Sequence, residues 1–201
     1  MEPSEVHPLM EPSDAAVSTD ARARIVRAGA RCITREGVTG ASMAAIAVEA
    51  GVSKALLHYH YHDRATLLGE IAERIGIEVV ERERAAVDES GSGGLDALWR
   101  WLEDELRRGE LAALAMLSLT RLGKVRLATR TAASERRRSA ARTIKHLFTE
   151  LDLTPRIPPA LLADAAVAFI DGLALDVANG TTRDPRVSYD IFWLALLGLT
   201  E

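Results

Sequence analysis

The sequence predicts an all-α protein of about nine helices, and three observations lead to this fold class. Hydrophobic residues make up 48% and charged residues 27% of the 201 residues, which suits a globular chain that buries a core. Aromatic residues amount to 4%, while Ala, Leu and Arg are frequent and β-branched runs are scarce, which favours helices. Apolar residues also recur at three- and four-residue steps over long segments.

The first residues are expected to form no stable structure. Residues 1–18 contain three prolines and four acidic residues and have little apolar surface to bury, so we predict a disordered arm. A helix is expected from about Asp20 to Arg35, ended by Gly37, with Ser18 or Thr19 as N-cap. Its apolar stripe includes Cys32, the single cysteine, which favours a buried structural thiol over a redox sensor and excludes an internal disulfide.

Residues 42–61 are predicted to form a helix-turn-helix. Ser42 is a plausible N-cap, and Gly51 suits the end of the first helix because a sharp turn needs a residue that tolerates positive φ. Ser53 can cap the second helix. The apolar residues that would close the core between the two helices are Met43, Ile46, Ala47, Ala50, Val52, Leu56 and Leu57.

The second of these helices is expected to show a polar face. Its outward residues would be Ser53, Lys54, Ala55, His58, Tyr59 and His60, which can meet phosphates and base edges in a major groove of DNA. The alternative is a helical hairpin of purely structural importance. Residues 20–65 hold seven Lys/Arg against four acids, a charge of +3, which leaves −7 for the rest of a chain of net charge −4. This uneven distribution favours local phosphate binding over unspecific coating of nucleic acid.

A long amphipathic helix is predicted from Arg64 to about Asp88. Arg64 stands in its first turn, where a cation is unfavourable to the helix dipole and a nearby phosphate would compensate. After a flexible linker at 90–94, further helices are expected at 95–108, 110–122, 124–152, 159–179 and 187–199. The last helix is apolar on nearly every side, so we expect it and 159–179 to form a homodimer interface. A central helix ringed by the others is the alternative.

Other kinds of site find little support in the sequence. His58, His60 and His62 alternate, but with only Asp63 nearby we expect no metal site. We see no nucleophile with a base, no phosphate loop and no cofactor fingerprint, so we expect neither an enzyme nor a cofactor. No apolar run reaches the ~20 residues of a membrane span, and no signal peptide is apparent. A cytoplasmic protein without membrane contact is the resulting expectation.

Over residues 20–70 the sequence resembles the TetR (tetracycline-repressor) family of bacterial transcription regulators. The residues that carry the likeness are Ser42, Ile46-Ala47, Ala50-Gly51-Val52-Ser53, Leu57, Tyr59-His60-Tyr61 and Arg64. A weaker likeness covers 171–175. Three positions depart from the usual pattern: His58 replaces a Tyr, Ile33 a Phe and Arg64 a Lys. Of these, His58 puts a phosphate contact in doubt, because neutral imidazole is shorter and weaker.

The resemblance implies a ligand-responsive regulator, with activation left open beside the repressor role that we favour. A homodimer would bind a palindromic DNA operator and be released by a small-molecule effector, hydrophobic and possibly anionic. The implied division is an arm at 1–18, a DNA-binding domain at 19–63 and a ligand-binding and dimerisation domain at 64–201. Backbone contacts would come from Ser42, His58, Tyr59, His60 and Arg64, and base contacts from Ser53, Lys54 and Ala55.

Two further sets of residues are expected in the second domain. Candidates for the effector pocket are Trp99, Met116, Leu119, Arg121, Phe148 and Phe169, each with plain core packing as the alternative. Candidates for the dimer interface are Phe169, Gly172, Leu173, Asp176, Phe192, Trp193 and Leu196. The competing functional hypothesis is a helical protein-interaction or ligand-binding protein in which the helix-turn-helix is only structural.

Overall fold

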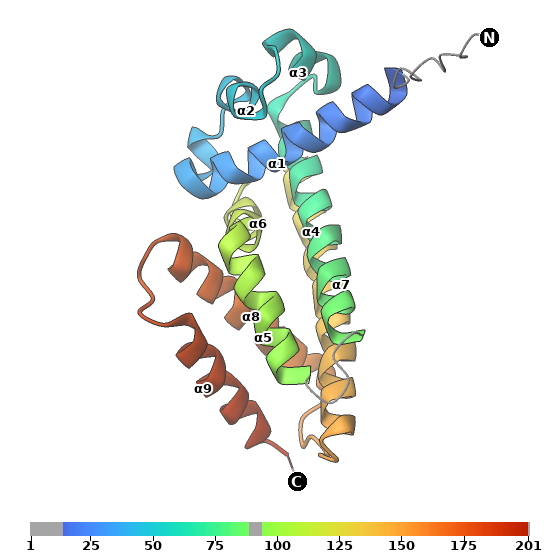
Figure 1. The fold of residues 1–201 in the computed structure, drawn as a ribbon, viewed down its shortest axis with the longest axis vertical. Helices are drawn as coiled ribbons and strands as arrows, with labels where there is room; N and C mark the ends of the chain where they lie inside the picture. The colour runs from blue at the N-terminus through green and yellow to red at the C-terminus, as the bar shows by residue number, and fades with distance from the viewer. Residues whose placement is uncertain (1–13, 89–93, 201) are drawn as a thin grey trace, which may run out of the picture.

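A computed structural model describes residues 14–88 and 94–200, which form helices joined by short connections (Figure 1). The all-α prediction is confirmed for these residues. The helices are α1 (Asp14–Gly40), α2 (Met43–Ala50), α3 (Lys54–His60), α4 (Arg64–Asp88), α5 (Gly94–Arg108), α6 (Glu110–Ser118), α7 (Gly123–Glu150), α8 (Pro159–Ala178) and α9 (Pro185–Leu197). Apart from them, an isolated bridge pairs Pro155 with Thr200.

The helices form an elongated molecule with α1, α2 and α3 at one end (Figure 1). Helix α4 runs from this end along the body and packs lengthwise against α7. The two helices approach closely at Gly76, where an added Cβ would lie 2.4 Å from the Cβ of Ala132. Glycine is therefore needed at this position for α4 and α7 to approach as they do.

A second contact joins the two ends of the molecule. Helix α6 packs against α1 and α4, and Leu111 and Ala113 of α6 are fully buried. The Thr34 hydroxyl of α1 donates a hydrogen bond of 2.9 Å to the carbonyl of Gly109, in the turn between α5 and α6. The α1–α3 module therefore rests on α6 as well as on α4.

Some helix boundaries differ from the sequence-based ones. Helix α1 begins at Asp14 rather than at Asp20, since Ala15 and Ala16 are strong helix formers and an acid suits a helix N-terminus. The rest of the predicted arm, and the linker residues 89–93, lie outside the described residues. Gly37, at φ 70°, interrupts α1 as predicted. Helix α6 ends at Ser118, four residues early.

The close approach of α4 to α7 leads to a test by substitution. Gly76→Ala should lower the free energy of unfolding by about 1–3 kcal/mol, because its methyl group must force the two helices apart. Thermal and urea unfolding would measure the change. Gly69→Ala is a control on the same helix, because its Cβ would meet nothing nearer than 3.7 Å and alanine favours helix. Equal stability of both variants would contradict this account of the packing.

Candidate nucleic-acid interface

The α2–turn–α3 unit is held by the caps that the sequence predicts. The Ser42 hydroxyl accepts a hydrogen bond from the Ala45 amide, and the Ser53 hydroxyl accepts one from the Leu56 amide, each at 3.1 Å. Between them Gly51 adopts the left-handed conformation, with φ 64° and ψ 36°, where an L side chain would be strained. The sequence thus fixes the angle between the two helices locally.

The core of this unit fixes which side of α3 faces outward. Leu57 and Ile46 are fully buried, and Ala47 is almost so. On the other side of α3, Lys54, Ala55 and the preceding Ser53 are exposed, as are His58 and Tyr59. This face stands at the far end of the molecule from the C-terminus (Figure 1), where a duplex would meet no obstruction from the body.

His60 differs from the other residues predicted on this face. It is only half-exposed, and its Nε2 atom is buried without a hydrogen-bond partner among the described residues. The physical reason is helical spacing, because His60 follows the buried Leu57 by three residues and so shares its side of the helix. The predicted outward orientation of His60 is therefore wrong.

Arg64 has a role in the fold that the sequence did not indicate. Its Nε donates a hydrogen bond of 3.0 Å to the carbonyl of Ala41, and its Nη2 donates one to the carbonyl of Val38. These carbonyls belong to the end of α1 and the connection to α2. They supply the compensation for a cation at a helix N-terminus that we expected from phosphate. The phosphate contact of Arg64 stays a prediction.

A buried tyrosine ties the end of α3 to α4. The Tyr61 hydroxyl donates a hydrogen bond of 2.9 Å to Glu70 Oε1, and Arg22 of α1 binds the other oxygen of Glu70 at 2.6 Å. Burial of the phenol, together with the Glu70 carboxylate, raises the pKa of Tyr61 to about 12. The phenol therefore stays protonated and keeps donating throughout the neutral range.

Most cations of the module are engaged within the protein. Arg31 and Arg35 both bind Glu49 of α2, at 2.8 Å and 3.1 Å, and so fasten α1 to α2. By contrast, Lys54 and Arg27 form no ion pair or hydrogen bond within the described part of the chain. Lys54 is the cation at the start of the exposed face of α3, which makes it the best-placed residue for a duplex.

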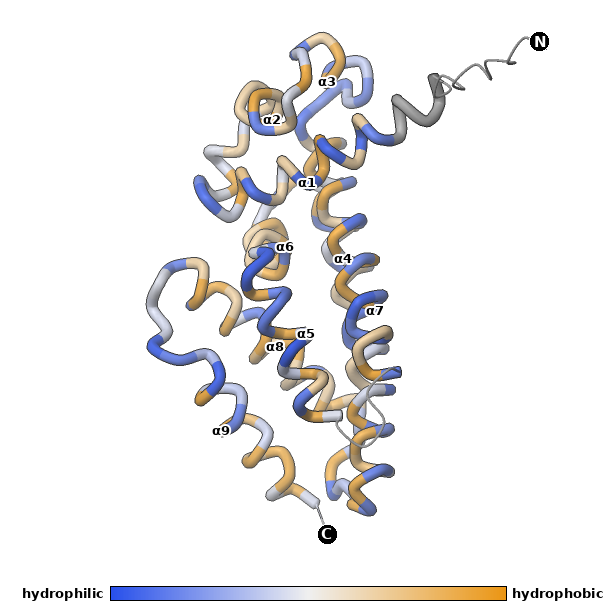
Figure 2. Tube along the Cα trace, viewed as in Figure 1, coloured by the Kyte–Doolittle hydropathy of each residue, from blue (hydrophilic) through white to orange (hydrophobic). Residues whose placement is uncertain are grey.

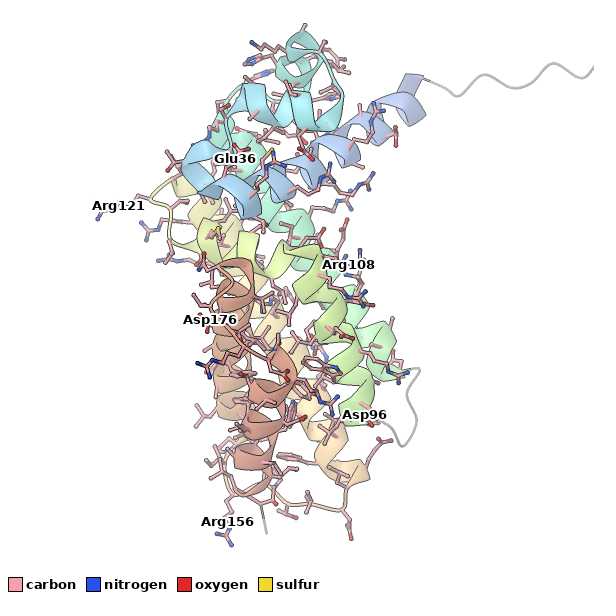
Figure 3. The ribbon with its side chains drawn as sticks, turned by 60° about the vertical axis from the view of Figure 1, so that its left-hand side comes forward. Glu36, Asp96, Arg108, Arg121, Arg156 and Asp176 are labelled. Carbon is pink, nitrogen blue, oxygen red and sulfur yellow. The ribbon has the colours of Figure 1, made fainter. Side chains whose placement is uncertain are left out.

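The residues predicted for an effector pocket are mostly elsewhere. A cavity lies among α4, α5, α7, α8 and α9, and Phe169 lines it, whereas the other five candidates do not. Leu119 is 79% exposed and Arg121 points away from the body (Figure 3), because α6 ends before both. Phe148 is buried outside the cavity lining, Met116 is half-buried, and the Trp99 ring lies under the guanidinium of Arg186.

Lining residues that the sequence did not indicate include Trp101 and Arg136. Trp101 is two positions from Trp99 and therefore points to the opposite side of α5. Helical phase was the available signal, since Leu98, Trp101, Leu102 and Glu105 all lie on the buried side.

The predicted dimer residues divide into two groups. Leu173, Trp193 and Leu196 are buried within the protomer and so cannot face a partner in this conformation, which corrects that part of the prediction. Gly172 and Asp176 are exposed on α8 (Figure 3), and the half-buried rings of Phe169 and Phe192 stack at 4.3 Å. Large apolar side chains that are exposed on α8 and α9 are Leu161, Val187, Ile191 and Leu194.

Two other kinds of site are absent from the described part of the chain. No three His, Cys, Asp or Glu residues lie together as potential metal ligands in the described part of the chain. Within residues 14–88 and 94–200, none of the helices combines the length and apolar character needed to cross a bilayer.

A capped helix-turn-helix with an exposed second helix, joined to a larger helical body, defines a DNA-binding regulator. Residues 25–71 match the family model of bacterial regulatory proteins of the tetR family. The helix-turn-helix segment therefore matches that of the TetR family, and the shared all-α fold supports a regulator of this family.

Solved structures share this fold over almost their whole length. A Pseudomonas aeruginosa PAO1 protein, described as a transcriptional regulator, is 25% identical, with 89% of each chain covered and a TM-score of 0.69. Regulatory protein TetR from Rhodobacter sphaeroides is 17% identical, with 90% of this chain and 99% of that chain covered and a TM-score of 0.74. The fatty acid degradation regulator FadR from Bacillus halodurans is 15% identical, with 89% of this chain and 95% of that chain covered and a TM-score of 0.72. No curated protein sequence matches the chain.

The contacts of Arg64 lead to a second test. Arg64→Ala should lower the free energy of unfolding by about 1–3 kcal/mol, because two carbonyls lose their donor. Thermal unfolding would measure this. Arg27→Ala removes an exposed cation without such bonds and should leave stability almost unchanged. If Arg64→Ala unfolds at the parent temperature, Arg64 does not hold the connection between α1 and α2.

Proposed function

We propose that the protein is a ligand-responsive transcription regulator, acting as a repressor, which binds a palindromic operator as a homodimer. The observation that carries this proposal is the exposed face of α3, where Lys54 has no ion pair among the described residues, on a module held by caps and ion pairs. In this proposal residues 19–63 bind DNA, and residues 64–201 bind the effector and form the dimer.

The DNA contacts follow from the exposed residues of the module. Lys54 would reach base edges or adjacent phosphates from the start of α3, and Ala55 leaves room for close approach to a thymine methyl. Ser53 would contribute beside them. Ser42, His58 and Tyr59 would contact the phosphate backbone, with His58 as the weakest of the three while its imidazole is neutral.

A dimer would cover the apolar surface that α8 and α9 expose. Ile191 and Leu194 of α9 are 62% and 69% exposed, and Leu161 of α8 is 58% exposed. The second half of α9 is predominantly apolar (Figure 2). Such a surface favours association, and a two-fold axis through it would leave both α3 helices free to reach half-sites about 34–36 Å apart.

The effector would act through α4, the helix shared by both ends of the molecule. At one end Arg64 of α4 holds the α1–α2 connection, and nearer the other end Glu83 lines the cavity. Arg82 binds Glu105 of α5 through two hydrogen bonds of 2.5 Å and 2.9 Å and Glu110 of α6 at 2.6 Å. A ligand that binds one position of α4 better would shift the equilibrium by that difference in affinity.

DNA binding by Lys54 can be tested directly. An operator would first be found by footprinting DNA near the gene, or by selection from random DNA. Lys54→Ala should weaken operator binding about 10- to 100-fold and binding to unrelated DNA much less, and it should lower the salt slope by up to about one. Fluorescence anisotropy would measure both.

Lys145→Ala serves as the control, because Lys145 is exposed on α7 far from the module. Unchanged operator binding by Lys54→Ala would remove Lys54 from the interface. If selection enriches no sequence at low salt, the helix-turn-helix has only a structural role.

The dimer surface can be tested by charge insertion. Ile191→Glu should convert a dimer into a monomer, because a carboxylate would be buried without a partner at the centre of the apolar surface. Light scattering after size-exclusion chromatography would measure the mass. Leu127→Glu, at a position that is 70% exposed on α7, should leave the dimer intact. A monomeric parent protein, or a dimeric Ile191→Glu variant, would contradict the proposed interface.

A further inference from the structure

The cavity in the body of the protein has an unusual combination of residues. Its lining includes the aromatic rings of Trp101, Phe169, Tyr189, Phe192 and Trp193, together with three polar side chains, Glu83, Arg136 and Thr143. All three polar residues are buried. Rings supply the faces for an apolar compound, so the buried polar groups decide which functional group that compound carries.

The two charged side chains that line this cavity differ in their pairing. The guanidinium of Arg136 binds the carboxylate of Asp171 at 2.7 Å, which neutralises its charge. Glu83 is 5% exposed and accepts a hydrogen bond of 2.8 Å from the Thr143 hydroxyl. It has no ion pair among the described residues. Glu83 is therefore the carboxyl group of the lining without a direct ion-pair partner, although the charges of Arg136 and Arg142 act on it from a distance.

A buried carboxyl group without an ion-pair partner is costly to ionise. Burial raises the pKa of Glu83, although hydrogen bonds from Thr143 and Ser139 and the charges of Arg136 and Arg142 oppose this. A ligand cation next to Glu83 would supply the missing charge in a low-dielectric surrounding, where the attraction is strong. Aromatic faces attract cations as well. An anionic ligand would meet the Glu83 carboxylate instead.

We propose that the cavity binds an apolar, aromatic-sized compound that carries a protonated amine, with the amine at Glu83. This inference rests on the proposed function as a ligand-responsive regulator. The expected charge of the effector changes from the anionic one considered from the sequence to a cationic one, because Arg121 lies on an exposed connection and Arg136 is already paired. Among the arginines that the structure describes, Arg136 alone lines the cavity.

Two further features indicate how such a ligand would be accommodated. The cavity has a volume of about 30 Å³, room for little more than water, so ring side chains must move to admit a ligand. Phe169 and Phe192 are half-buried and stacked, whereas Trp101 and Trp193 are buried, which places the opening at the phenylalanine pair.

The test uses three probes of one shape and different charge on the full chain without DNA. These are 4-tert-butylbenzylamine, 4-tert-butylbenzyl alcohol and 4-tert-butylbenzoate at neutral pH. Two of the three tryptophans of the chain line the cavity, so binding is followed by tryptophan fluorescence and confirmed by calorimetry. The amine should bind at least about tenfold more tightly than the alcohol, and the benzoate should bind most weakly.

Glu83→Gln tests the residue assigned to the amine. Glutamine keeps an acceptor for Thr143 but has no charge, so the preference for the amine over the alcohol should disappear while alcohol binding is retained. Glu81→Gln, an exposed change on the same helix, should keep the parent pattern. A preference for the benzoate, an amine preference that survives Glu83→Gln, or no binding of any probe would overturn the proposal.

DNA release is measured in a separate experiment, so that a failure of the proposed ligand class can be distinguished from a failure of the proposed regulator function. If the amine binds at Glu83 but does not release the operator, the ligand class stands and the effector role of the cavity is overturned. If the protein selects no DNA sequence, the regulator function fails while the fluorescence result is unaffected.

Discussion

The packing of α4 against α7 is the constraint on which the rest of the structure depends. Gly76 brings the two backbones so close that a methyl group would collide with Ala132. Helix α4 is thereby fixed along the body, while its first residue, Arg64, holds the connection between α1 and α2. The position of the DNA-binding module is consequently set by a helix whose other half borders the cavity. Any change that tilts α4 at the cavity must also move α3.

The DNA-binding module is attached to the body at a second place besides α4. The module also rests on α6, through the hydrogen bond from Thr34 to the Gly109 carbonyl. Arg82 joins α4 to the acids of α5 and α6, so these helices form one framework beneath the module. Glu105 is fully buried, and its separation from Arg82 would leave an uncompensated charge. The framework therefore favours a few discrete arrangements over gradual deformation, as a two-state switch requires.

The sequence was sufficient where structure is determined locally. The caps at Ser42 and Ser53 and the left-handed Gly51 depend on neighbours within a few residues, and all were predicted. It was insufficient where a side chain takes a partner far along the chain, as Arg136 does with Asp171 and Arg64 with Val38. Helical phase explains other errors: Trp99 and Trp101 lie on opposite sides of α5, and Leu173 faces inward on α8. A pattern shows that a helix is amphipathic, but it does not show which partner covers each side.

The charge distribution bears on how the protein would distinguish its operator from other DNA. The +3 charge of residues 20–65 led us to expect local phosphate binding, yet Arg31 and Arg35 bind Glu49, and Arg22 binds Glu70. Few cations therefore remain for phosphates, and unspecific binding, which depends on phosphate neutralisation, should be weak. In the proposed dimer, affinity would then come from base contacts near Lys54 and from two modules binding at once. A dimer with weak unspecific binding in each half loses its operator when a small change in separation prevents the second half from binding.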